Sequence, residues 1–378
     1  MPTSRVGLSS RTMCVWPIGP CAFGQLLAPM PRLAGSAMIS FAVPLAEKAL
    51  IAEIRRMATP SRQRRRADVG VRATRSAPAV LTGIGDDCAV LRVPPGHQML
   101  VTTDFALEGI HFRRDWHPAE VLGHRCLTRG LSDIAAMGGK PLAALLSLAL
   151  PRDLHQAWVR RFVHGLIGLA EQFGVTLAGG DTAESPNGIL ADIIVVGTVP
   201  KGTAVLRSGA HVGDRIFVSG QLGGSAAALW QMRKKPKTKL NVRDYPRHFL
   251  PQPRTELGRI LRERGLASAM IDTSDGLSTD LAHLCEESGV GAEVAAGLIP
   301  RASVGKPARE VDMEFALHGG EDYELLFTAP ATRRVPSRIA GVPITQIGHI
   351  TRGRKIFLMD RGGVRHELQP RGWEHFRQ

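Results

Sequence analysis

The stretch PAEVLGHRCLTRGLSDIAAMGG, residues 118–139, decides the fold class together with the run LAALLSLALP, residues 142–151. Apolar residues recur in the first stretch at helical spacing until a glycine pair ends it, which predicts a helix. The second run is continuously apolar and ends at a proline, which is typical of a buried strand. A helix that passes directly into a buried strand favours a domain in which helices pack on a sheet.

The same alternation continues along the chain. Residues 154–173 have helical periodicity, with Asp153 as the candidate N-terminal cap and Gly174 as the residue that ends the helix. Strands are predicted at VTLAGGDT, residues 175–182, and at ILADIIVVGTVP, residues 189–200. These elements predict an α/β or α+β first domain.

Further elements of this domain precede the opening stretch. Residues 44–57 have apolar positions at helical spacing and predict a short helix. The runs CAVLRV, residues 88–93, and QMLVTTDFAL, residues 98–107, are separated by the turn signal PPGHQ and are predicted to form two neighbouring strands. The first domain is therefore predicted at residues 44–200.

After residue 200 the pattern restarts. RIFVSGQLGGSAAALWQM, residues 215–232, predicts a strand, a glycine-rich turn and a helix. The basic, proline-containing segment 233–254 is predicted to be an exposed connection. Another helix is predicted at 255–265, and late strands complete a second α/β domain at residues 201–378.

The first residues differ from the rest of the chain. Residues 1–43 mix proline, glycine, serine and scattered apolar residues without a clear period. Prolines interrupt any apolar core that a secretory signal would need. We interpret this segment as a disordered extension or as the product of an over-early start codon, with Met38 as a plausible true start.

Composition bounds the class of protein. The 378 residues are 44% hydrophobic and 22% charged, which is typical of a soluble globular protein with room for two domains. Five cysteines without a CxxC pair argue against a disulfide framework or a zinc site and favour a reducing cytoplasm. No apolar run reaches the roughly 18 residues that a membrane span needs.

The net charge of +14 requires that a polyanionic partner be considered. Part of the excess comes from RQRRR, residues 62–66, and RKKPKTK, residues 233–239, which are more typical of solvated loops than of a nucleic-acid groove. A phosphorylated small molecule also suits a positive protein, so charge alone does not decide.

Aspartates recur at strand ends and in turns flanked by glycine. One such residue usually bonds its own backbone in a turn, but several at the ends of buried strands converge in space and need cations. Oxygen ligands without histidine or cysteine favour Mg²⁺, which usually bridges to substrate phosphates. The residues concerned are Asp86, Asp87, Asp104, Asp133, Asp181, Asp272 and Asp275.

The standard phosphate-binding loops are absent from the sequence. There is no G-x-x-x-x-G-K-[ST] motif, and no kinase-type G-x-G-x-x-G followed by V-A-I-K. The glycine-rich SGQLGGS at 219–225 has an unusual spacing and is weak evidence. The acidic positions therefore point to phosphates that are held through metal without such a loop.

Seven motifs in order carry a resemblance to a known family over residues 46–376. The chain resembles thiamine-monophosphate kinases, which belong to an aminoimidazole ribonucleotide synthetase-like superfamily of ATP-dependent enzymes. The resemblance implies two α/β domains, the first of which pairs across a homodimer to form a β-barrel-like sheet. The motifs are GIGDDCAVL, TTDFALEGIHF, LSDIAAMG, GGDT, LRSGAHVGD, IDTSDGLSTDL and GGEDYELLF.

The resemblance also implies roles for individual residues. Asp104, Asp133 and Asp181 are implied to be catalytic, and Asp104 and Asp133 each to bridge metals. Of the adjacent pair at 86 and 87, the motif selects Asp87. The implied Mg²⁺ ligands are Asp87, Thr102, Thr103, Asp104, Asp133, Asp181, Asp272 and Asp275.

The remaining implied contacts are to the two substrates. Gly180, Asp181, Arg207 and Ser274 are implied to bind ATP, and Arg207 offers a guanidinium suited to phosphate oxygens. Contacts to thiamine monophosphate are implied at His111, Glu321 and Trp373. Trp373 replaces the Tyr or Phe expected there but keeps an aromatic face. Without the motif, His111 is more typical of a core or surface histidine than of a ligand contact, and Trp373 could dock the tail.

The reaction implied by the resemblance is ATP-dependent phosphorylation of thiamine monophosphate to thiamine diphosphate, the final step of thiamine diphosphate biosynthesis. Direct in-line transfer on several Mg²⁺ ions would need no general base, because the attacking phosphate is already ionised. Another enzyme of the superfamily, similar to aminoimidazole ribonucleotide synthetase, is the first alternative. A basic nucleic-acid-binding protein is the second, and the lack of interleaved aromatic residues disfavours it.

Overall fold

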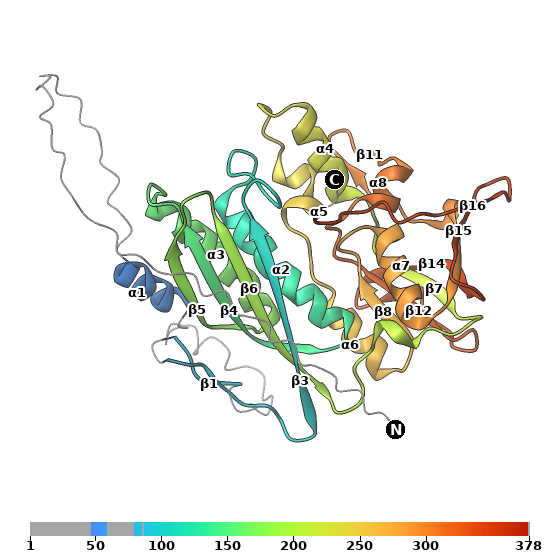
Figure 1. Ribbon diagram of the computed structural model, residues 1–378, viewed down its shortest axis with the longest axis horizontal. Helices are drawn as coiled ribbons and strands as arrows, with labels where there is room; N and C mark the ends of the chain where they lie inside the picture. The colour runs from blue at the N-terminus through green and yellow to red at the C-terminus, as the bar shows by residue number, and fades with distance from the viewer. Residues whose placement is uncertain (1–46, 59–78, 85–86, 377–378) are drawn as a thin grey trace, which may run out of the picture. The chain divides into compact units, whose positions relative to one another are not determined.

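The computed structural model describes residues 47–58, 79–84 and 87–376 of the chain. The predicted extension, residues 1–43, and the basic run at 62–66 lie outside the described residues. The described residues belong to one compact unit, in which the helix α2 (Ala119–Ala136) contacts strands of two separate sheets (Figure 1). Within this described part, no helix is long and apolar enough to cross a membrane.

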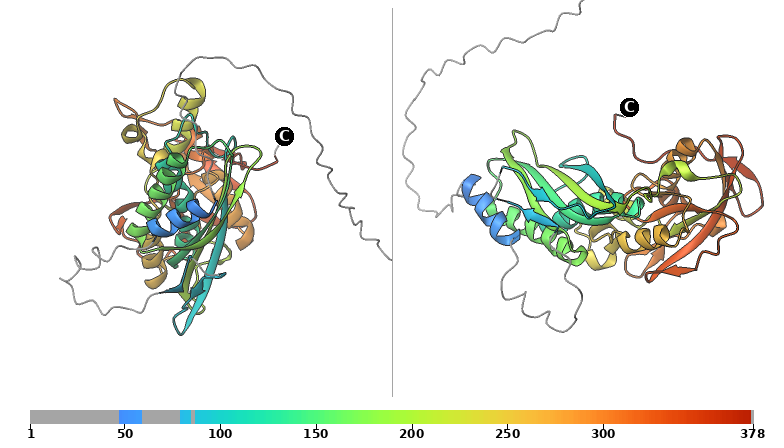
Figure 2. Two further views of the ribbon diagram at one scale, coloured as in Figure 1. Left: turned by 90° about the vertical axis from the view of Figure 1, so that its left-hand side faces the viewer. Right: turned by 90° about the horizontal axis from the view of Figure 1, so that it is seen from below.

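The first sheet has the strand order β3-β6-β4-β5, in which β4 and β5 are parallel and the other neighbours antiparallel. Helices α2 and α3 cover one of its faces (Figure 2). The elements described before residue 201, besides α2, are α1 (Glu47–Ala58), β1 (Val80–Thr82), β2 (Val90–Leu91), β3 (His97–Leu107), β4 (Lys140–Leu150), α3 (Gln156–Phe173), β5 (Thr176–Glu184) and β6 (Leu190–Pro200).

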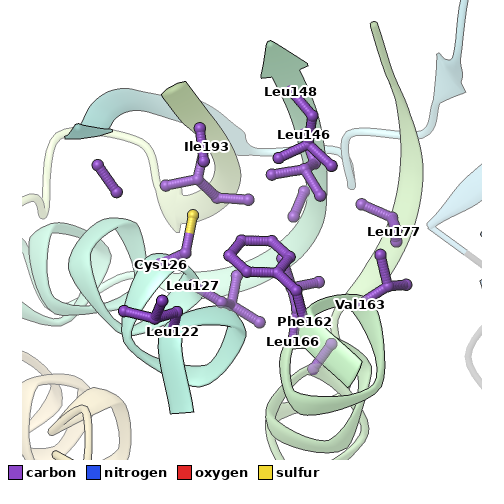
Figure 3. Packing of buried hydrophobic residues seen from close by; sticks show 14 of the residues in the cluster. Leu122, Cys126, Leu127, Leu146, Leu148, Phe162, Val163, Leu166, Leu177 and Ile193 are labelled. Atoms are coloured by element: carbon purple, nitrogen blue, oxygen red, sulfur yellow. The ribbon is translucent and has the colours of Figure 1, made fainter. Parts of the chain in front are cut away.

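The core of this part fills the space between the two helices and the sheet (Figure 3). Leu127 of α2, Phe162 and Leu166 of α3, Leu146 of β4 and Ile193 of β6 meet there, and none is more than 5% exposed. Burying one such side chain contributes about 1.5–3 kcal/mol. The helix predicted from residue 118 and the strand that follows it are confirmed as α2 and β4.

Two glycines let α2 and α3 approach closely. A Cβ atom added to Gly123 would lie 1.8 Å from the backbone oxygen of Phe162, and one added to Gly165 would lie 1.8 Å from the backbone oxygen of Glu120. No side chain fits at either position, so the two helix backbones are in direct contact at this crossing.

The other face of the first sheet carries exposed apolar side chains. Met99, Val101 and Phe105 of β3 are 48%, 63% and 54% exposed. Leu100 and Ala106, whose side chains point to the opposite face of the same strand, are buried. The alternation shows that β3 has one face in the core and one apolar face that the described residues leave open.

The second sheet has the order β16-β15-β9-β14-β7-β12-β8, with β13 paired to β14. The helices and strands described after residue 201 are β7 (Arg215–Ser219), α4 (Gly224–Lys234), α5 (Pro246–Phe249), α6 (Thr255–Glu263), β8 (Ala269–Asp272), α7 (Leu277–Ser288), β9 (Gly291–Ala295), β10 (Ser303–Val304), β11 (Arg309–Glu310), α8 (Met313–His318), β12 (Leu325–Ala329), β13 (Arg338–Ile339), β14 (Val342–Thr351), β15 (Ile356–Met359) and β16 (Arg365–Glu367). β10 and β11 form a separate two-stranded sheet. Short 3₁₀ turns lie at Arg207–Gly209, Val242–Asp244 and Ala296–Leu298.

Helices cover both faces of the second sheet. Val218 of β7 packs with Leu281 of α7 on one face, whereas Phe217 packs with Leu257 of α6 on the other. Successive residues of β7 thus enter different cores, as the two-residue period of a strand requires. Together the two parts give the α/β two-domain fold predicted from the sequence.

Two predictions for the first part are wrong. The runs at 88–93 and 98–107 are not paired with each other, because β2 pairs with β1 and β3 pairs along its whole length with β6. β2 turns back onto β1, whereas β3 is the edge strand of its own sheet, with β6 as its neighbour. Asp153 does not cap α3: the N-cap is His155, which makes no side-chain capping bond, and Asp153 lies exposed before it.

The segment 233–254 is only partly the exposed connection that was predicted. Residues 233–239 are exposed, but His248 and Phe249 are each 1% exposed and belong to α5. Phe249 packs with Val121 of α2, and the His124 Nε2 atom lies 2.8 Å from the Pro251 carbonyl oxygen. The second part of this segment is therefore a packed connection to α2.

Candidate active site

One cavity of about 1510 Å³ gathers most of the predicted site residues. It is lined by the end of β3, one side of α2, the loop after β8, the loop before β12, and the C-terminal tail. The predicted residues that line it are Thr103, Asp104, His111, Asp133, Asp272, Ser274, Asp275, Glu321 and Trp373.

Three carboxylates form one wall of the cavity. Asp104 comes from β3, Asp133 from α2 and Asp272 from the end of β8. The Thr102 hydroxyl donates to Asp133 Oδ2, and the Ser132 hydroxyl donates to Asp272 Oδ2 at 2.7 Å. Side chains of α2 and of the two sheets therefore position the carboxylates against one another.

These carboxylates are costly to ionise in the protein alone. Burial, then the charge of Asp133, raises the pKa of Asp104 to about 7 and that of Asp272 to about 8. Burial also raises the pKa of Asp133. The Asp104 Oδ2 atom is buried without a hydrogen-bond partner. The positive charges of Arg129 and Arg207 offset this only in part, and one acceptor atom of the wall has no donor.

The same cavity is lined by the residues predicted to contact thiamine monophosphate, His111, Glu321 and Trp373. The rings of His111 and His375 lie 5.3 Å apart, and those of Trp373 and His375 lie 5.6 Å apart. Trp373 is 44% exposed, and its backbone N–H donates to the Asp275 carbonyl oxygen at 3.0 Å. The tail therefore places an aromatic face beside the loop that follows β8.

Glu321 is held by two arginines of α2. Arg125 Nη2 donates to Glu321 Oε2 and Arg129 Nη2 donates to Glu321 Oε1, each at 2.7 Å. Burial by itself would raise the pKa of Glu321, but Arg125 and Arg129 outweigh it and set that pKa to about 2. Glu321 is therefore a fixed anion in this structure.

The loop that carries Glu321 is strained and firmly tied. Glu321 has φ 65° and Tyr323 has φ 51°, in the left-handed region that such residues rarely adopt. The Glu321 N–H donates to the Ser274 carbonyl oxygen at 2.8 Å, and the Tyr323 N–H donates to that of Thr273 at 3.0 Å. These bonds hold the two predicted motifs side by side.

The other acids of this motif organise the loops around the cavity. Asp322 accepts from the backbone N–H groups of Gly223 and Ser225 at the start of α4, at 2.6 and 3.3 Å. Glu324 is fully buried and pairs with Arg247 and Arg254. Through Glu321, Asp322 and Glu324, the sequence EDYE therefore contacts α2, the start of α4 and the segment before α6.

The remaining predicted residues lie outside the cavity lining. Asp87 is exposed in a bend before β2, and Asp86 lies outside the described residues. Arg207 is exposed. Its positive charge nevertheless acts on Asp133 and Asp272, where it lowers the pKa values that burial raises. Thr102 faces α2 through its bond to Asp133.

Gly180 and Asp181 lie on β5. Asp181 is exposed and is in register with Ser147 of β4, which is itself in register with Asp192 of β6. Thr103 donates to Asp192 at 2.6 Å, so Asp181 and Thr103 share the open face of the sheet. Gly180 has φ 145°, and a Cβ atom there would lie 1.9 Å from the Leu146 backbone oxygen.

Comparison with known families and proteins decides the relationship. AIR synthase related protein, N-terminal domain, matches residues 85–199, and AIR synthase related protein, C-terminal domain, matches residues 211–361. The thiamine-monophosphate kinase of Escherichia coli (strain K12) is 39% identical over 305 residues, which cover 78% of this chain and 91% of that protein. The chain belongs to the thiamine-monophosphate kinase family.

Solved structures of this family have the same fold. The crystal structure of thiamine-monophosphate kinase from Stenotrophomonas maltophilia K279a superposes with a TM-score of 0.68 at 35% identity, covering 84% of this chain and 97% of that one. The structure described as AaThiL complexed with AMPPCP and TMP has a TM-score of 0.67 at 33% identity, covering 75% and 89%. The predicted resemblance is confirmed.

Sequence reasoning missed several residues that line the cavity of this thiamine-monophosphate kinase family member. Arg129, Trp116, Ser225, Tyr323 and His375 line it together with the predicted residues. Arg129 had a detectable signal, because it stands four residues before Asp133 in the predicted helix and so on the same helix face. Ser225 and Trp116 had none, because their approach to the cavity depends on how distant elements pack.

Proposed function

We propose that the protein transfers the terminal phosphoryl group of ATP to thiamine monophosphate, giving ADP and thiamine diphosphate. One observation carries the proposal: a single cavity is lined by the carboxylates Asp104, Asp133 and Asp272 and also by His111, Glu321 and Trp373. The curated relatives are named thiamine-monophosphate kinase, and the solved relative named above is described as holding AMPPCP and TMP.

The residues of this chain orient and enclose the reactants. The acceptor is a phosphate oxygen that is already ionised at neutral pH, so no side chain has to remove a proton. Gly180, Asp181, Arg207 and Ser274 are proposed to hold ATP. His111, Glu321 and Trp373 are proposed to hold the thiamine part of the acceptor, with the Trp373 face available to its cationic ring. Alignment of two anions in one cavity then supplies most of the catalysis.

Magnesium fits the carboxylate wall. Among the residues that the structure describes, no three His, Cys, Asp or Glu side chains form a ready metal site by themselves. Mg²⁺ needs no such cage, because it keeps waters and binds through one or two carboxylates plus substrate phosphates. The partnerless Asp104 Oδ2 atom and the mutual repulsion of Asp104, Asp133 and Asp272 are the features that a cation would satisfy.

We propose that several Mg²⁺ ions are held there and neutralise the charge on the transferred group when bound. The proposed ligands are Asp87, Thr102, Thr103, Asp104, Asp133, Asp181, Asp272 and Asp275. Asp104, Asp133 and Asp181 are proposed to be the residues on which catalysis depends most.

We further propose a cytoplasmic homodimer in which the open face of the first sheet meets its copy and forms a barrel-like sheet. Met99, Val101 and Phe105 supply an apolar strip of the kind that obligate interfaces bury. Asp181 and Thr103 lie on this same face, so the dimer would enclose them. The domain boundaries proposed are 44–200 for the ATP, Mg²⁺ and dimer domain and 201–378 for the second domain.

The test is turnover by the purified protein with ATP, Mg²⁺ and thiamine monophosphate, with free thiamine as the matched control. Chromatography of the oxidised, fluorescent products separates the thiamine phosphates. We expect thiamine diphosphate from the monophosphate and no diphosphate from free thiamine. Product from free thiamine alone, or none from either compound, would overturn the proposal.

A further inference from the structure

Arg129 is a cation that faces the cavity from α2. It stands one helical turn before Asp133, and its side chain is 12% exposed. The cavity lining includes Arg129 together with Asp104, Asp133 and His111. A guanidinium this buried needs anionic partners, because removing an ion from water is costly.

The contact with Glu321 occupies only part of the hydrogen-bonding capacity of the Arg129 guanidinium. Among the hydrogen bonds of the described residues, Arg129 donates through Nη2 to Glu321 Oε1 at 2.7 Å. Arginine carries five N–H donors in a planar fork that matches two oxygens of a phosphate. The donors that Glu321 does not take belong to a side chain that lines the cavity.

The charge of Arg129 acts on His111 and on Asp104, which both line the cavity. After burial, it is the largest influence that lowers the pKa of His111, to about 4. It also opposes the burial and the Asp133 charge that raise the pKa of Asp104. Arg129 therefore shares one cavity with a proposed thiamine contact, His111, and a proposed metal ligand, Asp104, and its charge acts on both.

We propose that Arg129 binds the phosphate monoester of the acceptor and makes the site select the phosphorylated compound over its unphosphorylated form. This rests on the proposed function. Glu321 holds one edge of the guanidinium and leaves the other edge toward the substrate. Arg129 would then be a binding and specificity-determining residue that the family motifs do not include.

Arg125 provides a contrast within the same helix. It pairs with the other oxygen of Glu321 and also donates to the His248 carbonyl oxygen, and its side chain is only 4% exposed. Its donors are directed to protein atoms on both sides. Both arginines bind the Glu321 carboxylate, but of the two only Arg129 lines the cavity.

The test compares affinities for thiamine monophosphate and free thiamine, measured by calorimetry with Mg²⁺ and without ATP. The variants are Arg129→Gln, which removes the charge, and Arg129→Lys, which keeps it without the fork. Arg259→Gln is the matched control, because Arg259 also pairs with carboxylates, Glu256 and Glu263, but on the exposed side of α6.

We expect Arg129→Gln to weaken binding of the monophosphate about 10- to 100-fold while binding of thiamine changes less than about threefold. Arg129→Lys should be intermediate, and Arg259→Gln should leave both affinities unchanged. Thermal unfolding of each variant shows that it is folded. An unchanged ratio of the two affinities in folded Arg129→Gln would overturn the inference.

A double variant separates phosphate binding from simple neutralisation of Glu321. In Arg129→Gln/Glu321→Gln the carboxylate that has lost one of its two arginine partners is gone as well. If preference for the monophosphate stays low, Arg129 contacts the phosphate; if the preference returns, Arg129 acts only on Glu321 and the inference fails. Wild-type protein that binds the monophosphate without converting it would overturn the proposed function but leave this result valid, whereas binding of neither compound would overturn both.

Discussion

Asp133 shows how one residue of the site depends on three elements. It projects from α2, accepts from Thr102 of β3, and raises the pKa values of Asp104 and Asp272, after burial has done so. Charges of one sign that are gathered in this way lower stability unless a cation is present. Such an arrangement serves function rather than folding, so a substitution at Asp133 should affect turnover and stability differently.

Asp133→Asn should lower kcat at least 100-fold without lowering the melting temperature. The change keeps the size of the side chain and removes the charge that raises the pKa values of Asp104 and Asp272, so the metal-free fold is not destabilised, whereas metal binding is weakened. Steady-state kinetics and thermal unfolding are the measurements. Turnover within about threefold of wild type, less than about 1 kcal/mol in barrier, would show that Asp133 is not part of the metal site.

At the level of elements, the α2–α3 crossing depends on contact between backbones. Gly123 and Gly165 face Phe162 and Glu120 at a distance that leaves no room for a methyl group. Because α2 also carries Arg129 and Asp133, which line the cavity, this crossing helps to set the position of those side chains.

Gly165→Ala should lower the free energy of unfolding by about 1–3 kcal/mol or more, because the helices have to separate. Gly168→Ala in the same helix is the matched control. Nothing lies within 4 Å of its added Cβ, so alanine should raise stability by about 0.5–1 kcal/mol through helix propensity. Urea unfolding of both variants is the measurement, and equal effects of the same sign would contradict the packing argument.

The open face of the first sheet is the second feature at this scale. Val101→Glu and Phe105→Glu should shift the protein toward monomers in sedimentation velocity, because each places a charge in the proposed apolar interface. Leu298→Glu is the control, since Leu298 is 52% exposed on a 3₁₀ turn of the second part. A wild-type protein that sediments as a monomer, or variants that stay dimeric, would contradict the proposed dimer.

At the scale of the whole molecule, buried histidines join the two parts of the chain. His117 Nε2 lies 2.9 Å from His248 Nε2, and His248 Nδ1 lies 2.9 Å from the Ser225 hydroxyl. Ser225 can donate to His248, His248 to His117, and His117 to the Arg113 carbonyl oxygen at 3.0 Å, so that neutral rings satisfy every atom of the chain. Protonation of His117 would place two N–H groups against each other.

Acid should weaken this junction. Burial, followed by the charge of Arg125, lowers the pKa of His117 to about 4, whereas the unfolded value is near 6.5. The unfolded state therefore binds the proton first, and stability falls as pH drops from about 6.5 toward 4. His117→Gln should show a shallower loss of unfolding free energy between pH 7 and pH 5 than wild type. Parallel curves for the two proteins would mean that His117 is not the group responsible.

The local elements and the motif positions were predictable from the sequence, because each depends on neighbours within a few residues. Helical periodicity and the glycine pair fixed α2 and its passage into β4, and Gly174 ended α3 in the left-handed conformation. The ordered motifs also identified the family. The local turn signal after Asp87 misled, because β2 pairs with β1 and not with β3.

Only the tertiary structure decided which side chains meet. Glu321 and Arg129 are separated by 192 residues, and His117 and His248 by 131, and no periodicity relates such positions. Their contacts follow from the packing of α2 between two sheets, which sets burial and local charge. The sequence by itself therefore determined the elements, the family and the candidate carboxylates. The packing decided that Glu321 is a fixed anion and that Arg129 faces the substrate cavity. The physical reason is that the strength of an ion pair depends on distance and burial rather than on order in the chain.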